Sequence, residues 1–128
     1  AAFNRIMDAM SLPKKTDEEK AARAAAMQDA TLYATEVPLR TMKASCKVFE
    51  LVEAMASEGN PNSVSDAGVG ALAARSAVLG AFLNVKINAA GLKDREKADA
   101  LVAEAAVIAE EAVKQEAKII EIVNAKIG

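Results

Sequence analysis

Residues 66–90, DAGVGALAARSAVLGAFLNVKINAA, decide the fold of this chain. The segment is apolar on nearly every helical face, which predicts a helix at the centre of the molecule with neighbours on every side. Gly68, Gly70 and Gly80 each lower helix stability by about 1 kcal/mol relative to alanine. We therefore expect another helix or a ligand to approach closely at these glycines.

Turn signals bound this central helix on both sides. Gly59-Asn60-Pro61-Asn62 is the strongest turn cluster in the chain, and Ser63 followed by Asp66 predicts a capped helix start. Downstream, Gly91 ends the helix and residues 94–97, DREK, open a last helix of about 30 residues, or about 45 Å. Its apolar positions follow a mostly heptad stripe, interrupted by Gln115: Leu101, Ala105, Ile108, Ala112, Ile119 and Ile122.

The N-terminal half predicts further helices. The apolar spacing at the start indicates that the chain opens inside a helix, which ends near Ser11. Residues 16–19, TDEE, form a capping-box pattern with three acids on the positive helix end. The next helix runs to about Ser57, and Pro38 removes the hydrogen bond to the Ala34 carbonyl. We expect either a kinked helix or two helices that meet at Val37–Pro38.

Composition agrees with this pattern. The 128 residues form a single domain, 1–128, and include 30 alanines with only 3% aromatic residues, which favours helices over a sheet. The predicted fold is all-α, an elongated antiparallel helical bundle of four to five helices, kinked at Pro38. Because small side chains bury little area, we expect a homodimer or higher homo-oligomer.

Charge and residue usage exclude several function classes. The net charge of −2 and pI near 5.3 argue against nucleic acid as a partner. One cysteine and no histidine leave no zinc site and no Ser/His/Asp triad, so we expect no metal. Arg75 splits the longest apolar stretches, Ala67–Ala74 and Ser76–Leu83, which predicts no membrane span. A single cysteine cannot close an internal disulfide, which fits a cytoplasmic protein. Cys46 lies on an apolar stripe, where a packed thiol is favoured over a nucleophile.

Polar side chains gather at the start of the central helix. Their simplest interpretation is a capped turn, but they exceed what one helix start requires, and free helix amides suit an anionic or carbonyl-bearing ligand. The residues concerned are Asn60, Asn62, Ser63, Ser65 and Asp66.

Isolated polar residues also follow along the central helix. Asp66 and Asn84 are 18 residues apart and share one azimuth, with Asn88 about 40° away. Arg75 and Lys86 lie together on the opposite side. Two interpretations stay open: hydrogen bonds and an Arg–acid pair between helices, or a cleft for a polar heterocycle with cations for the acidic groups of a ligand or second subunit. Lys14 and Lys15 form either a solvated loop or another anion site.

Residues 59–94, GNPNSVSDAGVGALAARSAVLGAFLNVKINAAGLKD, resemble the cyclodeaminase/cyclohydrolase family. This family includes the C-terminal domain of formiminotransferase-cyclodeaminase and stand-alone methenyltetrahydrofolate cyclohydrolases. The resemblance extends to AFNRIMDAMSLPK at 2–14, to ATEVPL at 34–39 and to Cys46. It implies an all-helical, dimeric folate enzyme that acts on one-carbon units attached to tetrahydrofolate. Family members carry a Pro-Gly-Gly-Gly-Ser segment and a helix ahead of the matched part, so the domain is expected to lack its N-terminal segment.

The resemblance also implies roles for the polar residues. Asp66 would supply the carboxylate that moves protons or holds the pterin amide edge, and Asn84 and Asn88 would support the ring. The other implied site residues are Asn60, Asn62, Ser63 and Ser65 around the substrate, and Lys14, Arg75 or Lys86 for the glutamate tail.

The reaction itself is left open by the resemblance. It is either closure of 5-formimidoyltetrahydrofolate with loss of ammonia or hydrolysis of 5,10-methenyltetrahydrofolate. Neither needs a cofactor beyond the tetrahydrofolate substrate. The alternative is a non-catalytic helical dimerisation module or an inactive fragment of such an enzyme.

Overall fold

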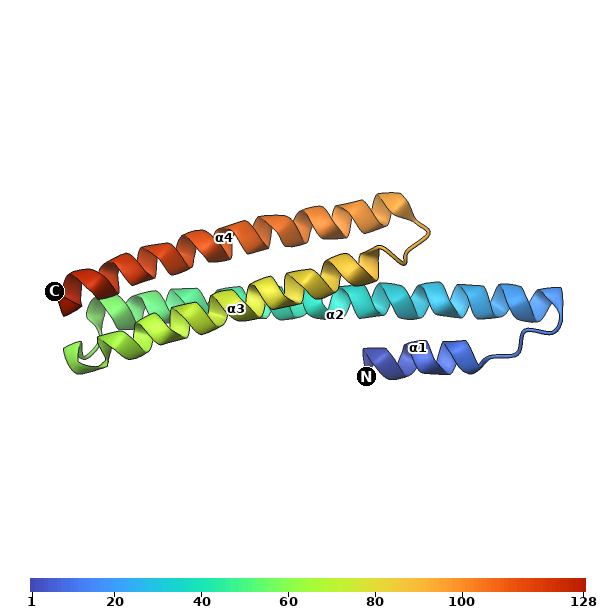
Figure 1. Cartoon of the computed structure of the whole chain (residues 1–128), viewed down its shortest axis with the longest axis horizontal. Helices are drawn as coiled ribbons and strands as arrows, with labels where there is room; N and C mark the ends of the chain where they lie inside the picture. Colours follow the sequence, from blue (N-terminus) through green and yellow to red (C-terminus); the bar gives the residue numbers. More distant parts are fainter.

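The computed structural model describes all residues, 1–128, and consists of helices joined by short connections. The elements are α1 (Ala2–Ser11), α2 (Asp17–Glu58), the 3-10 turn η1 (Pro61–Ser63), α3 (Val64–Ala89) and α4 (Arg95–Ile127). Figure 1 shows α2 running the length of the molecule, with α3 and α4 packed along it and α1 folded back beside its N-terminal half. The predicted all-α antiparallel bundle is confirmed.

Helix α2 is one continuous element. It begins with the predicted capping box, in which the Thr16 hydroxyl accepts the Glu19 amide at 3.1 Å and the Glu19 carboxylate accepts the Thr16 amide at 3.2 Å. Pro38 lies inside the helix, so the alternative of two separate helices meeting at Val37–Pro38 is wrong. Asp17, Glu18 and Glu19 in the first turn of α2 complement the helix dipole.

The start of α3 differs from the prediction. Ser63 makes no side-chain cap; instead the Asn60 side chain accepts the Asn62 amide at 3.0 Å and η1 precedes the helix. Pro61 explains the difference, because its fixed φ favours the tight turn in which the Ser63 amide already bonds the Asn60 carbonyl at 2.9 Å. The predicted Ser63–Asp66 cap is therefore replaced by an Asn60 turn.

The core lies where α2, α3 and α4 meet. Its largest fully buried side chains include Phe49 and Met42 from α2, Val78 from α3 and Ile119 from α4. Two glycines of α3 allow the close approach that the sequence predicts. A Cβ on Gly68 would lie 3.3 Å from Val123, and a Cβ on Gly70 would lie 3.3 Å from Val52.

The outward face of α3 corrects one expectation. Within the chain α3 has neighbours on one side only, so the predicted burial on every side is wrong. Val69, Leu83 and Ile87 are 64%, 62% and 73% exposed. Gly80 opens on the same face, and an added Cβ there would meet nothing within 4 Å.

Helix α3 also meets a simple membrane criterion. Together with η1 it has a segment with a mean hydropathy of 1.4, so by length and composition it is long enough and apolar enough to cross a bilayer. The exclusion of a span on the ground of length was therefore too strict. The central helix of a soluble protein meets the same criterion, and Arg75 in the middle of α3 is paired with Glu116 of α4.

Candidate functional site

A groove of about 590 Å³ lies where α1, α2 and the C-terminal half of α3 come together. Apolar side chains from α1 and α2 form its walls, and α3 contributes small residues and two asparagines. No charged side chain lines it. The lining residues are Ala2, Phe3, Ile6, Ala34, Val37, Pro38, Thr41, Ser76, Ala77, Gly80, Ala81, Asn84 and Asn88.

Asn88 closes one end of this groove by a contact with α2. Its side-chain amide donates to the Ala34 carbonyl at 3.0 Å. That carbonyl is the one left without a helical donor by Pro38, since proline has no amide hydrogen. Asn88 therefore satisfies the carbonyl that Pro38 leaves free and aligns α3 against α2. The interhelical hydrogen bond that the sequence left as one interpretation is present.

Asn84 has a different environment from Asn88. It is exposed, and its amide makes one long hydrogen bond of 3.4 Å to the Gly80 carbonyl on its own helix. Thr41 and Ser76 add hydroxyl groups to the same groove. Apolar walls with a few amide and hydroxyl groups are the usual lining of a site for a flat heterocycle with polar edges.

The polar turn at residues 59–66 lies at the other end of α3. Asp66 and Asn84 are 18 residues apart on one helix, which separates them by about 27 Å along its axis. The predicted cleft that combines Asp66 with Asn84 and Asn88 is therefore not formed within one chain. None of the polar residues of the turn lines a groove, and most are exposed: Asn60, Asn62, Ser65 and Asp66, with Ser63 half-buried.

The two cations of α3 have separate partners. The Arg75 guanidinium lies 3.3 Å from the Glu116 carboxylate, whose residue is only 7% exposed, so this is the Arg–acid pair between helices. The Lys86 ammonium lies 4.6 Å from the centre of the Phe82 ring. Eleven residues separate Arg75 from Lys86, or about 16 Å, so they do not form one anion site.

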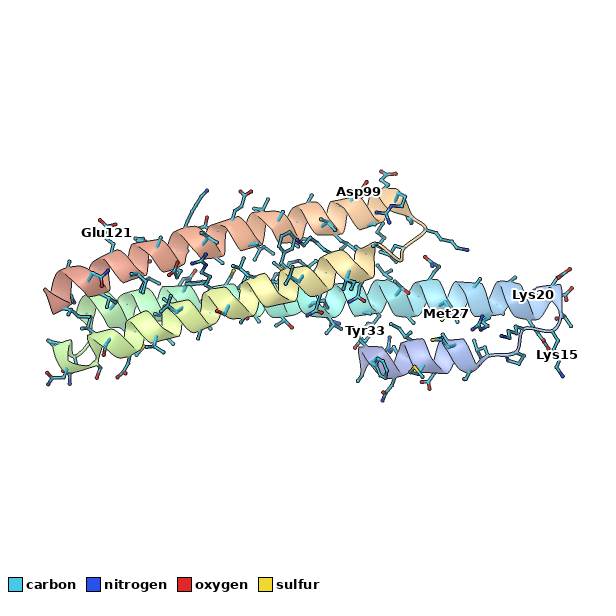
Figure 2. All side chains as sticks on the ribbon, in the orientation of Figure 1. Lys15, Lys20, Met27, Tyr33, Asp99 and Glu121 are labelled. Carbon is cyan, nitrogen blue, oxygen red and sulfur yellow. The ribbon has the colours of Figure 1, made fainter.

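Lys14 belongs to the loop between α1 and α2. This loop is exposed and lies at the end of the molecule opposite the 59–63 turn, as the labels Lys15 and Lys20 show in Figure 2. The structure therefore does not bring Lys14 to the polar turn. Figure 2 also labels Tyr33, whose ring lies 3.8 Å from the Arg5 guanidinium and ties α1 to α2.

Cys46 is half-buried and faces α4. Its sulfur lies 4.0 Å from the Ile108 carbonyl oxygen, and it packs against the core. Burial, and then the Glu111 carboxylate, raise the pKa of the thiol above its ordinary value of 9.0. A protonated, packed thiol agrees with the structural interpretation of Cys46. No cluster of three His, Cys, Asp or Glu side chains gathers anywhere to hold a metal ion.

Sequence reasoning missed the α1 side of the groove. The apolar spacing at the start of the chain predicted a helix only, and it gave Phe3 and Ile6 no part in a site; Thr41 and Ser76 were not singled out either. Pro38 was the available signal, because the carbonyl that a proline leaves free inside a helix needs a donor from another group.

Comparison with known proteins identifies the family. The family model for formiminotransferase-cyclodeaminase matches residues 1–107. The chain belongs to this family. The resemblance seen in residues 59–94 is thereby confirmed.

Individual members of the formiminotransferase-cyclodeaminase family cover the chain to different extents. The chain is 44% identical over 127 residues, or 99% of its length, to a methenyltetrahydrofolate cyclohydrolase of Methylorubrum extorquens. It is 38% identical over 74% of its length to the formimidoyltransferase-cyclodeaminase of Gallus gallus, and 33% identical over 96% to that of Dictyostelium discoideum. The chain spans 61% of the length of the first relative and 18% and 22% of the other two.

Proposed function

We propose that this protein is a cytoplasmic folate enzyme that hydrolyses 5,10-methenyltetrahydrofolate. The observation that carries the proposal is the 44% identity to a methenyltetrahydrofolate cyclohydrolase over 99% of the chain. The groove beside α3 supports it, since its size and lining suit a pterin ring. The acidic chain argues against nucleic acid as a partner, and the Arg75–Glu116 pair in the middle of α3 argues against a membrane.

The groove offers the pterin two kinds of contact. Phe3, Ile6 and Pro38 present apolar surface for the ring faces. Asn84 offers an amide donor and acceptor for the polar ring edge. Asn88 is committed to Ala34 through its amide nitrogen, so its role in the groove is to fix the wall and present its amide oxygen.

The reaction requires proton transfer and orientation. Water adds to the methenyl carbon between N5 and N10 and gives up a proton, which forms a tetrahedral carbon. The bond from this carbon to N5 then breaks as N5 takes a proton. The hydroxyl oxygen gives up its proton and becomes the carbonyl oxygen of the formyl group, which stays on N10.

Asp66 is the carboxylate that we assign to this proton transfer, with Asn60, Asn62, Ser63 and Ser65 beside it. Because Asp66 lies about 27 Å along α3 from Asn84 of its own chain, the assignment requires a second copy to supply Asp66, in the homodimer that the family resemblance implies. Lys14, Arg75 and Lys86 remain the candidate cations for the glutamate tail. Lys14 and Lys86 are exposed, whereas Arg75 is paired with Glu116.

A second candidate reaction is closure of 5-formimidoyltetrahydrofolate with loss of ammonia. It is favoured by the family model and by the cyclodeaminase relatives that match about three quarters of the chain. Both reactions pass through a tetrahedral carbon between N5 and N10, so one groove and one carboxylate serve either.

The test is the loss of methenyl absorbance on mixing the protein with 5,10-methenyltetrahydrofolate. We expect consumption by the wild-type chain and about a tenfold lower rate for Asn84→Ala, the effect of one lost hydrogen bond of about 1.4 kcal/mol. Asn124→Ala is the matched control, because Asn124 is an exposed asparagine of α4 that lines no groove. Ammonia release from 5-formimidoyltetrahydrofolate without methenyl consumption would favour the second reaction. Inactivity on both substrates would leave the non-catalytic module.

A further inference from the structure

Pro38 and Asn88 are linked through one carbonyl group. A residue inside an α-helix donates its amide to the carbonyl four positions earlier, but Pro38 has no amide hydrogen to give to Ala34. The Asn88 side chain supplies that hydrogen from α3, at 3.0 Å. Since a carbonyl oxygen only accepts, the end of the Asn88 amide that lies against Ala34 is the nitrogen. Pro38 therefore decides which way round the Asn88 amide is held.

The oxygen of the Asn88 amide is open to a ligand. It makes no hydrogen bond within the chain, because the contact with Ala34 uses the nitrogen. Asn88 is half-buried, and no buried side-chain nitrogen or oxygen lacks a hydrogen-bond partner, so this unpaired oxygen reaches the surface. Asn88 lines the groove between α1, α2 and α3. The groove thus contains a hydrogen-bond acceptor whose orientation is fixed.

Two neighbouring side chains of the groove have the same polarity. The Asn84 nitrogen donates to the Gly80 carbonyl at 3.4 Å. The Thr41 hydroxyl donates to the Val37 carbonyl at 3.2 Å. Each side chain uses a donor on its own helix and keeps an oxygen for the groove. Both of these bonds are local, so Asn88 is the acceptor whose orientation depends on a contact between two helices.

A row of acceptors selects a ligand by its N–H donors. A site built to make a hydrogen bond rejects a ligand without the matching group, because the polar atom of the site is then left unpaired. The 2-amino group and the adjacent N3–H of a pterin are donors, whereas its 4-position carries a carbonyl oxygen. An oxygen cannot donate to another oxygen, so the donor edge of the pterin is the edge that fits against Asn88.

We propose that Pro38 is a positioning residue that determines the specificity of the groove. By freeing the Ala34 carbonyl, Pro38 holds the Asn88 amide with its oxygen towards the groove. That oxygen accepts a hydrogen bond from the 2-amino group of a pterin ring. The choice of ligand rests on the proposed folate function, whereas the fixed orientation of Asn88 does not.

Two small ring compounds test this role. Pterin carries the 2-amino group, and pteridin-4-one has the same ring without it. Binding of pterin is followed by its fluorescence, and binding of pteridin-4-one by competition with pterin. We expect the wild-type chain to bind pterin about tenfold more tightly, the effect of one hydrogen bond to the groove. Equal affinity for the two compounds, or no binding of pterin, would overturn the proposal.

Pro38→Ala is the decisive variant. Its new backbone amide donates to the Ala34 carbonyl, so the Asn88 amide is free to rotate and present its nitrogen to the groove. We expect the preference for pterin over pteridin-4-one to fall to about twofold or less. A merely structural proline would change the affinity for both compounds by the same factor, so an unchanged preference would refute the positioning role.

Pro13→Ala is the matched control for this measurement. It makes the same substitution in the exposed loop between α1 and α2, and Pro13 does not line the groove. The variant should therefore keep the wild-type preference for pterin. Loss of the preference in both variants would show that it does not depend on Asn88 and Ala34.

A second substitution at Asn88 provides rescue. Asn88→Asp replaces the amide by a carboxylate, in which both ends accept, so rotation no longer changes the group that faces the ligand. In the Pro38→Ala background the Ala34 carbonyl already has a donor. There Asn88→Asp should restore the preference for pterin to about tenfold or more. A double variant that binds both compounds equally would contradict the assignment of the acceptor to Asn88.

Consumption of 5,10-methenyltetrahydrofolate separates this proposal from the proposed function. A chain that consumes the methenyl compound but shows no preference for pterin keeps the folate function and loses the role of Pro38. A chain whose preference for pterin is lost in Pro38→Ala, but which is inactive on both folate substrates, keeps the positioning role and loses the catalytic function.

Discussion

The Asn88 side chain donates to the Ala34 carbonyl at 3.0 Å across 54 residues of sequence. Ala34 is 6% exposed, and Pro38 supplies no amide to its carbonyl. A helix interrupted by proline therefore stays continuous because a neighbouring helix satisfies the freed acceptor. The same bond holds α3 in register with α2 beside the groove.

Asn88→Ala should lower the free energy of unfolding by about 1–3 kcal/mol, because a buried acceptor loses its donor. Pro38→Ala restores an amide that can donate to the Ala34 carbonyl. In the Pro38→Ala background, Asn88→Ala should therefore lower the free energy of unfolding by less than half as much. Urea unfolding of the four chains of this double-mutant cycle measures the coupling. Equal effects in both backgrounds would mean that Asn88 does not compensate for the helical hydrogen bond that Pro38 removes.

Removal of Arg75 should expose the dependence of Glu116 on its partner. Arg75→Met leaves a nearly buried carboxylate without its cation and should cost about 1–3 kcal/mol of unfolding free energy. The double change with Glu116→Met should recover most of the loss. Lys20→Met, in the exposed pair with Asp17, is the control and should change stability by less than about 0.5 kcal/mol. Thermal or urea unfolding measures these changes in unfolding free energy. If Arg75→Met destabilised the chain no more than Lys20→Met does, the Arg75–Glu116 pair would not stabilise the fold.

The glycines of α3 should respond differently to a methyl group. Gly80→Ala adds a Cβ into open space and should raise the unfolding free energy by up to about 1 kcal/mol. Gly68→Ala places a Cβ 3.3 Å from Val123, so the gain in helix propensity should be cancelled or reversed. Both variants are compared with the wild-type chain by urea unfolding. A larger gain at Gly68 than at Gly80 would contradict the packing of α3 on α4.

Because of Cys46, the free energy of unfolding should depend on pH in the alkaline range. Its pKa is raised in the folded chain, so folding stabilises the protonated thiol. This contribution is present below pH 9.0, the ordinary pKa of the group, and is lost as pH rises through the folded value. Urea unfolding at a series of pH values should therefore show a steeper decline above pH 9.0 for wild type than for Cys46→Ala. Parallel profiles would mean that the thiol is as solvated in the folded chain as in the unfolded one.

The sequence predicted elements whose signals are local. Thr16 and Glu19 lie within one turn of each other, so their capping box could be read directly from spacing. Ser63 and Asp66 show the same spacing, but Asn60 and Pro61 form a competing turn within the same few residues. Where two local patterns overlap, spacing alone does not decide which hydrogen bonds form.

The candidate site shows the same limit on a larger scale. Helical periodicity correctly placed Asp66 and Asn84 at one azimuth, but it does not predict which other helices lie beside each of these residues. The groove beside Asn84 exists only because α1 folds back along α2 and brings Phe3 to α3. That approach depends on the packing of three helices.

By itself, the sequence determined the helical class, the start of α2, the approximate length of α4 and the family, because helix propensity, capping and a long motif are properties of neighbouring residues. Only the tertiary structure decided which polar groups meet. Asn88 finds Ala34 and Arg75 finds Glu116 across 54 and 41 residues, respectively. Those pairings are set by the register in which whole helices bury their apolar faces against one another, and no local pattern fixes that register.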